Sequence, residues 1–494
     1  MKEWLHNNRW FLLVTVFCLL PLFFINVKDS HDWGDDFAQY LLQAENIIKG
    51  KPQTETGYVY DPRFPVVAPP AYPAGFPLML APVYAVRGHS ILHYNLLITF
   101  VLFLFCLMMA IFFRNYFSWY ASLLLVMLFA YNAWTLDFKT NILSDFPFAL
   151  FLLLSTTLYL RMRTLQGALA VGASVALMLL TRGVGFVFLV AVLLQGMVLF
   201  FRRKNAEEGK KVLLHLAVIA GVSLTLQTLV NTVLFHIPSE GFFTFYKKAY
   251  DGKDIGDTVI LNLNYYVEVF KAFFQPWVER WTFVSSAAAS LSLVLLLAGM
   301  IYSLLKERSF MDLLAWLYIL LFLLYPYSAG GFRFIMPVIP FLLVYMVRGL
   351  LAFRITEHVS RPALVLAAFV FAFLLYQPGV TKILESQKNI PEGPQRDYAQ
   401  ELFTYINMHL APQDLVLFKK PKALALYSHV RTCSTVYDQQ PSDVASVCDN
   451  LGVGYLLLTK DAADAPLENF IRSYPARVAL QWQNDHFTFY KVLH

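Results

Sequence analysis

The sequence predicts a mainly α-helical bundle that crosses a membrane many times and carries a small α/β domain at its C-terminus. The chain has 494 residues, of which 58% are hydrophobic and only 15% charged, and its mean hydropathy is +0.53. This composition excludes a water-soluble globular protein. After Gln377 the long apolar runs stop and short alternating segments begin. We therefore predict a membrane domain over residues 1–380 and an α/β domain over residues 381–494.

Apolar stretches long enough to cross a bilayer recur through the first three quarters of the chain. A crossing helix needs about 20 mostly apolar residues. We predict about eleven spans, over residues 10–27, 92–113, 117–134, 146–160, 166–181, 184–201, 212–235, 284–305, 311–327, 334–350 and 362–377. The first span is too long for the core of a cleaved signal peptide, so we expect it to remain as an anchor.

Basic residues predict the orientation of the bundle, because Lys and Arg collect in short cytoplasmic loops. Every second connection carries them, at Arg9, Arg114, Arg161, Arg163, Arg202, Lys210, Lys306, Arg308, Arg348 and Arg361. This places the N-terminus in the cytoplasm, and the loop after the first span and the α/β domain on the outer face. The net charge of +6 then reflects topology and does not indicate nucleic-acid binding. No Asn-x-Ser/Thr acceptor occurs, which favours a bacterial cytoplasmic (inner) membrane.

Two aspartates lie in the first outer loop, at the start of a predicted surface helix. From Asp36 the apolar residues recur at every third or fourth position, and Lys49-Gly50 provide a C-terminal cation and a stop. The helix dipole keeps Asp35 and Asp36 ionised, which suits a general base or the ligands of a divalent cation such as Mg²⁺ or Mn²⁺. The alternative is that Asp35 caps the helix and Asp36 pairs with its dipole.

A proline-rich segment follows between residues 62 and 82. Proline fixes φ and favours an extended path. Within this segment Tyr72-Pro73-Ala74-Gly75-Phe76-Pro77 leads back towards the membrane. The segment is either a rigid linker or the wall of a substrate groove.

Three further charged residues lie at the outer ends of predicted spans. Asp145 is the first residue of the fourth span and follows a potential N-cap, Ser144. It has either a role in the functional site or only a capping role at the start of this helix. Arg182 lies in the turn between the fifth and sixth spans, and Arg333 precedes the tenth. A single arginine there can simply reach the lipid headgroups. Two on the face that bears Asp35, Asp36 and Asp145 indicate a phosphate-binding site instead.

The C-terminal region alternates predicted helices, over 398–410, 421–427, 442–451 and 467–474, with predicted strands, over 415–418, 432–437, 455–458, 478–482 and 487–492. It contains no Gly-rich phosphate loop, metal-spaced Cys/His set or Gly-x-Ser-x-Gly motif. We therefore expect it to dock an acceptor or to cover the active face. Cys433 and Cys448 fall in this outer region, where an oxidising compartment would permit a disulfide, and the spacing alone leaves their pairing open.

Several short motifs occur in a familiar order and on one predicted face: Trp33-Gly34-Asp35-Asp36 with Tyr40, Tyr72-Pro73-Ala74-Gly75-Phe76-Pro77, Ser144-Asp145-Phe146-Pro147, Thr181-Arg182-Gly183 and Phe332-Arg333-Phe334-Ile335-Met336-Pro337. In these the chain resembles the GT-C superfamily of integral-membrane glycosyltransferases. The resemblance is to the branch that holds protein O-mannosyltransferases and the lipid A aminoarabinose transferase, and it covers the whole chain.

The resemblance implies inverting transfer of a sugar from a polyprenyl-phosphate donor to a lipid, glycan or protein acceptor at the outer face. It implies catalytic roles for Asp35, Asp36 and Asp145, with a first-loop carboxylate as the general base. Arg182 and Arg333 would bind the donor phosphate, and Tyr40 and Tyr72 would contribute to substrate binding. The aminoarabinose transferase pattern has a Glu-Lys pair where this chain has Pro70-Ala71-Tyr72-Pro73. The acceptor and any dependence on a divalent cation are therefore not implied.

A lipid or glycolipid flippase is the main alternative. Such transporters typically show inverted repeats, interrupted helices and charges deep in the bundle. Here the charges lie at the outer ends of the spans, and no clear repeat is present. A non-catalytic membrane scaffold is a third interpretation, and it leaves these charges unexplained.

Overall fold

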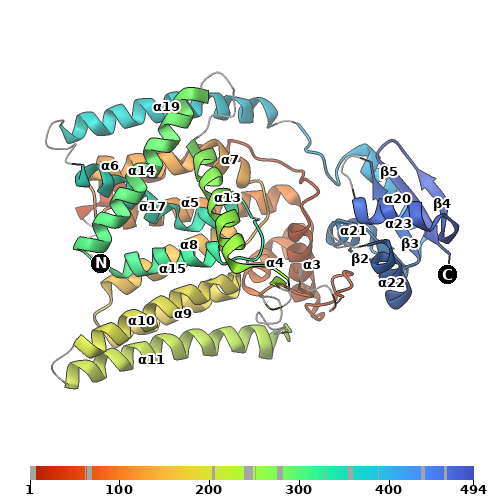
Figure 1. The fold of residues 1–494 in the computed structure, drawn as a ribbon, viewed down its shortest axis with the longest axis horizontal. Helices are drawn as coiled ribbons and strands as arrows, with labels where there is room; N and C mark the ends of the chain where they lie inside the picture. Colours follow the sequence, from red (N-terminus) through yellow and green to blue (C-terminus); the bar gives the residue numbers. More distant parts are fainter. Residues whose placement is uncertain are drawn as a thin grey trace. The chain divides into compact units, whose positions relative to one another are not determined.

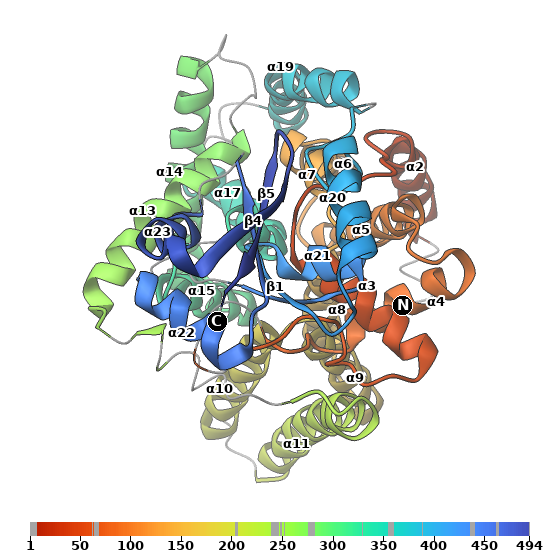
Figure 2. The same ribbon diagram turned by 90° about the vertical axis from the view of Figure 1, so that its right-hand side faces the viewer.

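The computed structural model describes residues 7–61, 63, 69–202, 206–238, 247, 249–250, 252–274, 282–328, 330–353, 360–387, 389–434, 440–460 and 464–493. The protein is mainly helical (71%) with one small sheet (Figures 1 and 2). Its contacts divide it into two compact units. The helical unit comprises Met1–Val27, Asn95–Val230 and Tyr250–Lys388, and the α/β unit comprises Lys28–Tyr94, Asn231–Ala249 and Asn389–His494. The domain boundary at residue 380 stays a prediction.

The apolar runs of the sequence form the helices that build the helical unit. These are α2 (Arg9–Leu19) with η1 (Leu20–Phe23), α5 (Ile91–Phe113), α6 (Trp119–Ala130), α7 (Ala133–Phe138), α8 (Asp145–Arg161), α9 (Leu165–Thr181), η2 (Gly183–Gly185), α10 (Phe186–Arg202), α11 (Ala206–Thr228) with η3 (Leu229–Leu234), α13 (Ile255–Phe274), α14 (Thr282–Lys306), α15 (Phe310–Leu323), α16 (Phe332–Ile335), η5 (Met336–Val338), α17 (Ile339–Ala352) and α19 (Arg361–Ser386).

Six of the described helical segments are long and apolar enough to cross a membrane: Ile91–Phe113, Gly183–Phe201, Glu207–Leu234, Ser286–Lys306, Phe332–Leu350 and Pro362–Ser386. Four shorter apolar segments accompany them, namely Arg9–Phe23, Trp119–Ala130, Leu165–Thr181 and Phe310–Leu323. Each predicted span contains a helix, and α8 accounts for the remaining one. The chain is thus a multi-pass membrane protein, while the exact span count stays a prediction.

Small residues allow two membrane helices to touch along their backbones. A Cβ atom on Gly299 of α14 would lie 1.8 Å from the carbonyl oxygen of Tyr345 in α17. A Cβ atom on Gly349 of α17 would lie 2.1 Å from the carbonyl oxygen of Leu295. Neither position can carry a larger side chain, which is typical of close helix packing inside membranes.

The helix predicted from Asp36 is confirmed as α3 (Asp36–Lys49) in the α/β unit, and its position on the membrane surface stays a prediction. Gly50 follows it in a left-handed conformation with φ of 65°, which ends the helix as the sequence predicts. Phe37, Tyr40 and Leu41 are buried, and α3 packs against α4 (Gly75–Arg87). The first loop therefore leads into a rigid pair of helices.

The C-terminal part of the α/β unit is a five-stranded sheet in the order β2-β1-β3-β5-β4. β1 (Leu415–Leu417) pairs in parallel with β2 (Arg431–Cys433) and β3 (Tyr455–Thr459), whereas β5 (Phe487–Val492) pairs antiparallel with β3 and β4 (Val478–Gln483). The helices are α20 (Asp397–His409), α21 (Pro421–Ser428), α22 (Pro441–Leu451) and α23 (Ala465–Ser473), and η6 is Pro475–Arg477. Every predicted strand and helix is found; the second strand, predicted over 432–437, runs from Arg431 to Cys433 and ends before Ser434, and residues 435–439 lie outside the described part.

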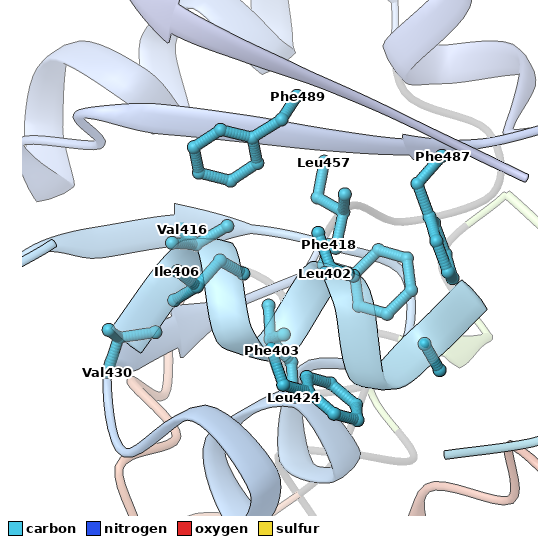
Figure 3. Close-up of a cluster of buried hydrophobic side chains, with 11 residues drawn as sticks. Leu402, Phe403, Ile406, Val416, Phe418, Leu424, Val430, Leu457, Phe487 and Phe489 are labelled. Carbon is cyan, nitrogen blue, oxygen red and sulfur yellow. The ribbon is translucent and has the colours of Figure 1, made fainter. Parts of the chain in front are cut away.

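Both faces of this sheet are covered by apolar side chains, because neighbouring residues of a strand point to opposite faces. Val416 and Leu457 join Leu402, Phe403, Phe487 and Phe489 in one core, shown in Figure 3. Leu415, Leu417 and Leu456 join a second core that contains Cys433 and Cys448. Both cysteines are free thiols, and burial raises the pKa of Cys448 to about 12. The two cysteines thus act here as apolar packing residues.

Candidate functional site

Asp35 caps a helix that lies far from it in the sequence. Its Oδ1 accepts hydrogen bonds from the backbone N–H groups of Lys422, at 2.9 Å, and Ala423, at 3.3 Å. These groups belong to the first turn of α21, where backbone donors have no partner within the helix. The capping alternative raised for Asp35 therefore applies, although to a different helix from the predicted one.

Asp36 begins α3 and takes part in a different set of contacts. The Tyr72 hydroxyl donates a hydrogen bond of 2.5 Å to Asp36 Oδ1. The ammonium of Lys422 lies 3.4 Å from the same oxygen and 3.6 Å from Oδ2 of Asp35. The Asp36 side chain keeps 32% of its surface exposed, while Lys422 keeps only 2%. The Asp35 side chain keeps 19% of its surface exposed, so Asp36 is the more accessible carboxylate of the pair.

Burial and charge act against each other in this cluster. Burial lowers the pKa of Lys422, but the charges of Asp36 and Asp35 outweigh it, so the pKa lies above its usual value and Lys422 stays protonated. Burial raises the pKa of Asp35, and Lys422 only partly opposes this. Burial and the neighbouring Asp36 hold the pKa of Tyr72 well above its usual value, which keeps the phenol as a hydrogen-bond donor.

A row of buried amides on α3 holds the proline-rich segment in place. The Gln43 side chain accepts from the backbone N–H of Tyr72 at 3.0 Å and donates to its carbonyl at 2.9 Å. Gln39 donates to the carbonyls of Pro69 and Pro70. Because residues 69–73 form neither helix nor strand, these amides satisfy backbone groups of Pro69, Pro70 and Tyr72 and fix Tyr72. Residues 69–73 are therefore part of the site.

Aromatic contacts connect the predicted tyrosines with the site. The Tyr40 ring packs on the Tyr72 ring with centroids 4.6 Å apart, and meets Phe76 edge-on at 4.8 Å. The Trp33 ring packs edge-on against Phe403, Phe418 and Phe487 of the core in Figure 3. The loop that carries the aspartates is consequently anchored in the core of the α/β unit.

The arrangement of Asp35 and Asp36 does not fit a divalent cation. Mg²⁺ requires oxygen ligands at about 2.0–2.1 Å and Ca²⁺ at about 2.3–2.6 Å. Here Oδ1 of Asp35 binds two backbone N–H groups, while its Oδ2 and Oδ1 of Asp36 face the ammonium of Lys422. Across the described residues, no group of three or more His, Cys, Asp or Glu side chains is placed to hold a metal ion.

A second charged cluster lies within the helical unit and joins three of the predicted site residues. Asp145, the first residue of α8, is 1% exposed and forms an ion pair with Arg182 at the end of α9. Its other oxygen lies 3.3 Å from Nε of Arg333 in α16. The two arginine side chains remain 21% and 29% exposed. One buried carboxylate thus positions two accessible guanidinium groups.

The helical unit also contains a large apolar cavity of about 900 Å³. It lies among α2, α6 and α19, and its lining is Cys18, Tyr120, Leu123, Leu124, Met127, Leu128, Tyr131, Pro362, Leu366, Phe373, Tyr376, Gln377, Val380, Thr381 and Leu384. Such a volume and lining suit the hydrocarbon chain of a lipid.

Sequence reasoning missed Lys422 and the amides of α3. Lys422 looks like an ordinary exposed lysine at a helix start, because nothing nearby in the sequence marks its distant partners. The amides could have been found, since Gln39, Gln43 and Asn46 recur at helical spacing on the apolar side of a predicted helix.

Comparisons of the sequence found no matching family model and no matching curated protein. Solved structures do match. ArnT from Cupriavidus metallidurans, bound to undecaprenyl phosphate, aligns over 98% of both chains with 13% identity and a TM-score of 0.57. The oligosaccharyltransferase AglB from Archaeoglobus fulgidus, in complex with an inhibitory peptide and a dolichol-phosphate, aligns over 92% of this chain and 70% of its own, with 12% identity and a TM-score of 0.54. The Archaeoglobus fulgidus oligosaccharyltransferase in complex with Zn and sulfate gives 14% identity over 91% and 68%, with a TM-score of 0.58. At these identities the likeness shows the fold.

Proposed function

Because the fold of this chain matches the GT-C superfamily, as its motifs predict, we propose that it is a glycosyltransferase that uses a polyprenyl-phosphate sugar. It transfers the sugar, with inversion, to a hydroxyl of a lipid, glycan or protein acceptor. The observation that carries this proposal is the cluster in which Asp145 holds Arg182 and Arg333.

The arginine pair suits the donor. When the bond between sugar and phosphate breaks, negative charge grows on the phosphate, and two guanidinium groups stabilise it through short charge-assisted hydrogen bonds. Asp145 positions both groups without cancelling their combined charge. ArnT bound to undecaprenyl phosphate and AglB bound to a dolichol-phosphate support a polyprenyl-phosphate donor.

The carboxylate cluster suits the acceptor. We assign the general base to Asp36, because it is the more exposed carboxylate while Asp35 is bound to the backbone of α21. Asp36 takes the proton of the acceptor hydroxyl while the oxygen of that hydroxyl bonds to the anomeric carbon of the sugar. The bond from this carbon to the phosphate oxygen breaks on the opposite face, which gives inversion. Tyr72 orients Asp36 and Tyr40 packs behind it. A divalent cation, present as Zn in one structure of the fold, is not required by these steps.

The positions of the charges set the expected topology. The N-terminus lies in the cytoplasm, and the α/β domain lies on the outer side of a bacterial cytoplasmic membrane, where polyprenyl-linked sugars would meet their acceptors. This follows from the basic connections of the sequence. A reactive tag at Cys433 or Cys448 would be blocked by burial, so we would place a single new cysteine at the exposed Asp485 for labelling from outside.

The test is a transfer assay on the full chain in nanodiscs with a panel of polyprenyl-phosphate sugars. We expect the wild type to consume one donor, Asp36→Asn to lose this activity, and the exposed control Asp485→Asn to keep it. A flippase would instead move lipid across the bilayer equally well with Asp36→Asn. Consumption of every donor at equal rates by the wild type and Asp36→Asn would contradict the proposed base.

A further inference from the structure

The ammonium of Lys422 lies against both carboxylates of the Asp35–Asp36 pair. We propose that Lys422 is a positioning residue that provides the permanent cation of the Asp35–Asp36 pair, so that this pair works without a divalent cation. The proposal builds on the proposed function, since it says how the candidate base is held.

The ammonium of Lys422 is surrounded on several sides. It lies 3.6 Å from Asp35 and 3.4 Å from Asp36, and it donates a hydrogen bond of 2.9 Å to the Tyr72 hydroxyl. It also lies 4.8 Å from the centroid of the Tyr72 ring and 5.8 Å from that of Tyr58, within range of cation–π attraction. These contacts match the three donors and the single charge of an ammonium group.

The backbone of Lys422 is fixed as firmly as its side chain. Its N–H binds Asp35, and its neighbour Pro421 accepts a hydrogen bond of 2.7 Å from the Thr432 hydroxyl. The backbone of Thr432 in turn forms a parallel β-bridge with the backbone of Tyr58, whose ring faces the ammonium. The backbone of Lys422 therefore cannot move away from the pair without breaking these hydrogen bonds of the first turn of α21.

The charge of Lys422 opposes the binding of a metal ion at this pair. A divalent cation bound to both carboxylates would lie within a few ångströms of a buried ammonium, and like charges at such a distance repel strongly in a partly desolvated site. Removal of the ammonium would leave two adjacent carboxylates with little water around them. A variant without Lys422 should therefore bind a divalent cation where the wild type does not.

The test is titration of the full chain in nanodiscs with Mn²⁺, followed by electron paramagnetic resonance of the free ion. We expect equal Mn²⁺ binding by the wild type and Asp36→Asn, and at least tenfold tighter binding of one ion by Lys422→Met. This gain should disappear in Lys422→Met/Asp36→Asn, and Lys420→Met, a change two residues earlier in the same segment, should behave as the wild type.

A merely structural lysine would not produce this pattern. Thermal unfolding shows whether Lys422→Met folds, and folded Lys422→Met without the additional ion would overturn the proposal. Mn²⁺ binding by the wild type that Asp36→Asn abolishes would overturn it as well, and this comparison needs no change at Lys422. In turnover assays we expect a chelator to leave the wild type unchanged, Lys422→Met to lose at least tenfold in kcat, and Mn²⁺ to restore part of it.

The ion titration does not depend on sugar transfer, so the two proposals fail separately. A wild type that consumes no donor contradicts the proposed function, while its Mn²⁺ titration still decides the role of Lys422. A wild type that transfers sugar only with Mn²⁺ bound to the pair keeps the proposed function and overturns the role of Lys422.

Discussion

The two charged clusters of this protein are built in opposite ways. In the α/β unit two carboxylates, Asp35 and Asp36, share one ammonium. In the helical unit two guanidinium groups, Arg182 and Arg333, share one carboxylate. The first cluster has an excess of negative charge and suits proton removal, and the second has an excess of positive charge and suits an anion. In both, the residue in the minority, Lys422 or Asp145, is almost fully buried and positions the other two.

Asp36 should show the largest effect in this comparison. Asp36→Asn keeps the shape of the side chain but removes its basicity, so we expect kcat to fall by about 10²–10⁴-fold, the usual contribution of a general base. Single-turnover transfer in nanodiscs measures this loss. The thermal unfolding temperature should change little. A loss below tenfold would break the assignment of proton removal to this cluster.

Replacement of Arg182 or Arg333 should lower the transfer rate somewhat less than Asp36→Asn does. Arg182→Lys and Arg333→Lys keep the charge but lose the paired N–H donors that match a phosphate. We expect each to lower kcat/KM for the donor by about 10²-fold, as for the loss of one donor to a developing oxyanion. Arg477→Lys, whose guanidinium pairs with Asp449 in the α/β unit, serves as control. If Arg182→Lys and Arg333→Lys kept the same kcat/KM for the donor as the control Arg477→Lys, the assignment of the donor phosphate to the helical unit's cluster would be wrong.

Asp35 should differ from its neighbour, and this difference sharpens the assignment within the first cluster. Asp35→Ala removes the cap of α21, and we expect the free energy of unfolding to fall by about 1 kcal/mol. Chemical denaturation followed by tryptophan fluorescence measures this loss. Asp35→Asn should recover part of it, because an amide oxygen also accepts the N–H bonds. If Asp35→Asn lowered turnover as far as Asp36→Asn, the base would have to be reassigned.

Lys139 is a second buried lysine, and we expect its replacement to change only the pH dependence of stability. Its pKa is lowered by burial, whereas that of Lys422 is raised by the neighbouring carboxylates. Lys139 lies between the third and fourth predicted spans, is 1% exposed, and its ammonium binds the neutral oxygens of Asn26 and Thr99. Burial lowers its pKa to about 7. Because the unfolded chain then binds a proton that the folded chain does not, the stability should rise between pH 7 and pH 10.

Lys139→Met should remove this dependence. We expect the unfolding temperature of the wild type to rise with pH over this range relative to that of the variant, and to run parallel to it below pH 7. Parallel curves over the whole range would show that Lys139 remains charged in the fold, as Lys422 does.

Local signals explain what the sequence could predict. The bounds of α3 follow from apolar spacing and from Lys49-Gly50, and the strands of the sheet follow from short apolar runs between turns. The association of Asp145, Arg182 and Arg333 followed from their shared position at the predicted outer ends of spans. Lys422 could not be found in this way, because its partners are more than 300 residues away and only the folded sheet brings α21 to the first loop.

The contact between Asp35 and α21 also sets an order of events during synthesis. The first loop leaves the ribosome 387 residues before the lysine that completes its cluster. At about 5–20 residues per second, this delay is roughly 20–80 s. Throughout it Asp35 and Asp36 lack both the helix that one of them caps and the ammonium that they share. The nascent chain thus acquires its acidic pair in working form only when the last part of the protein has been made.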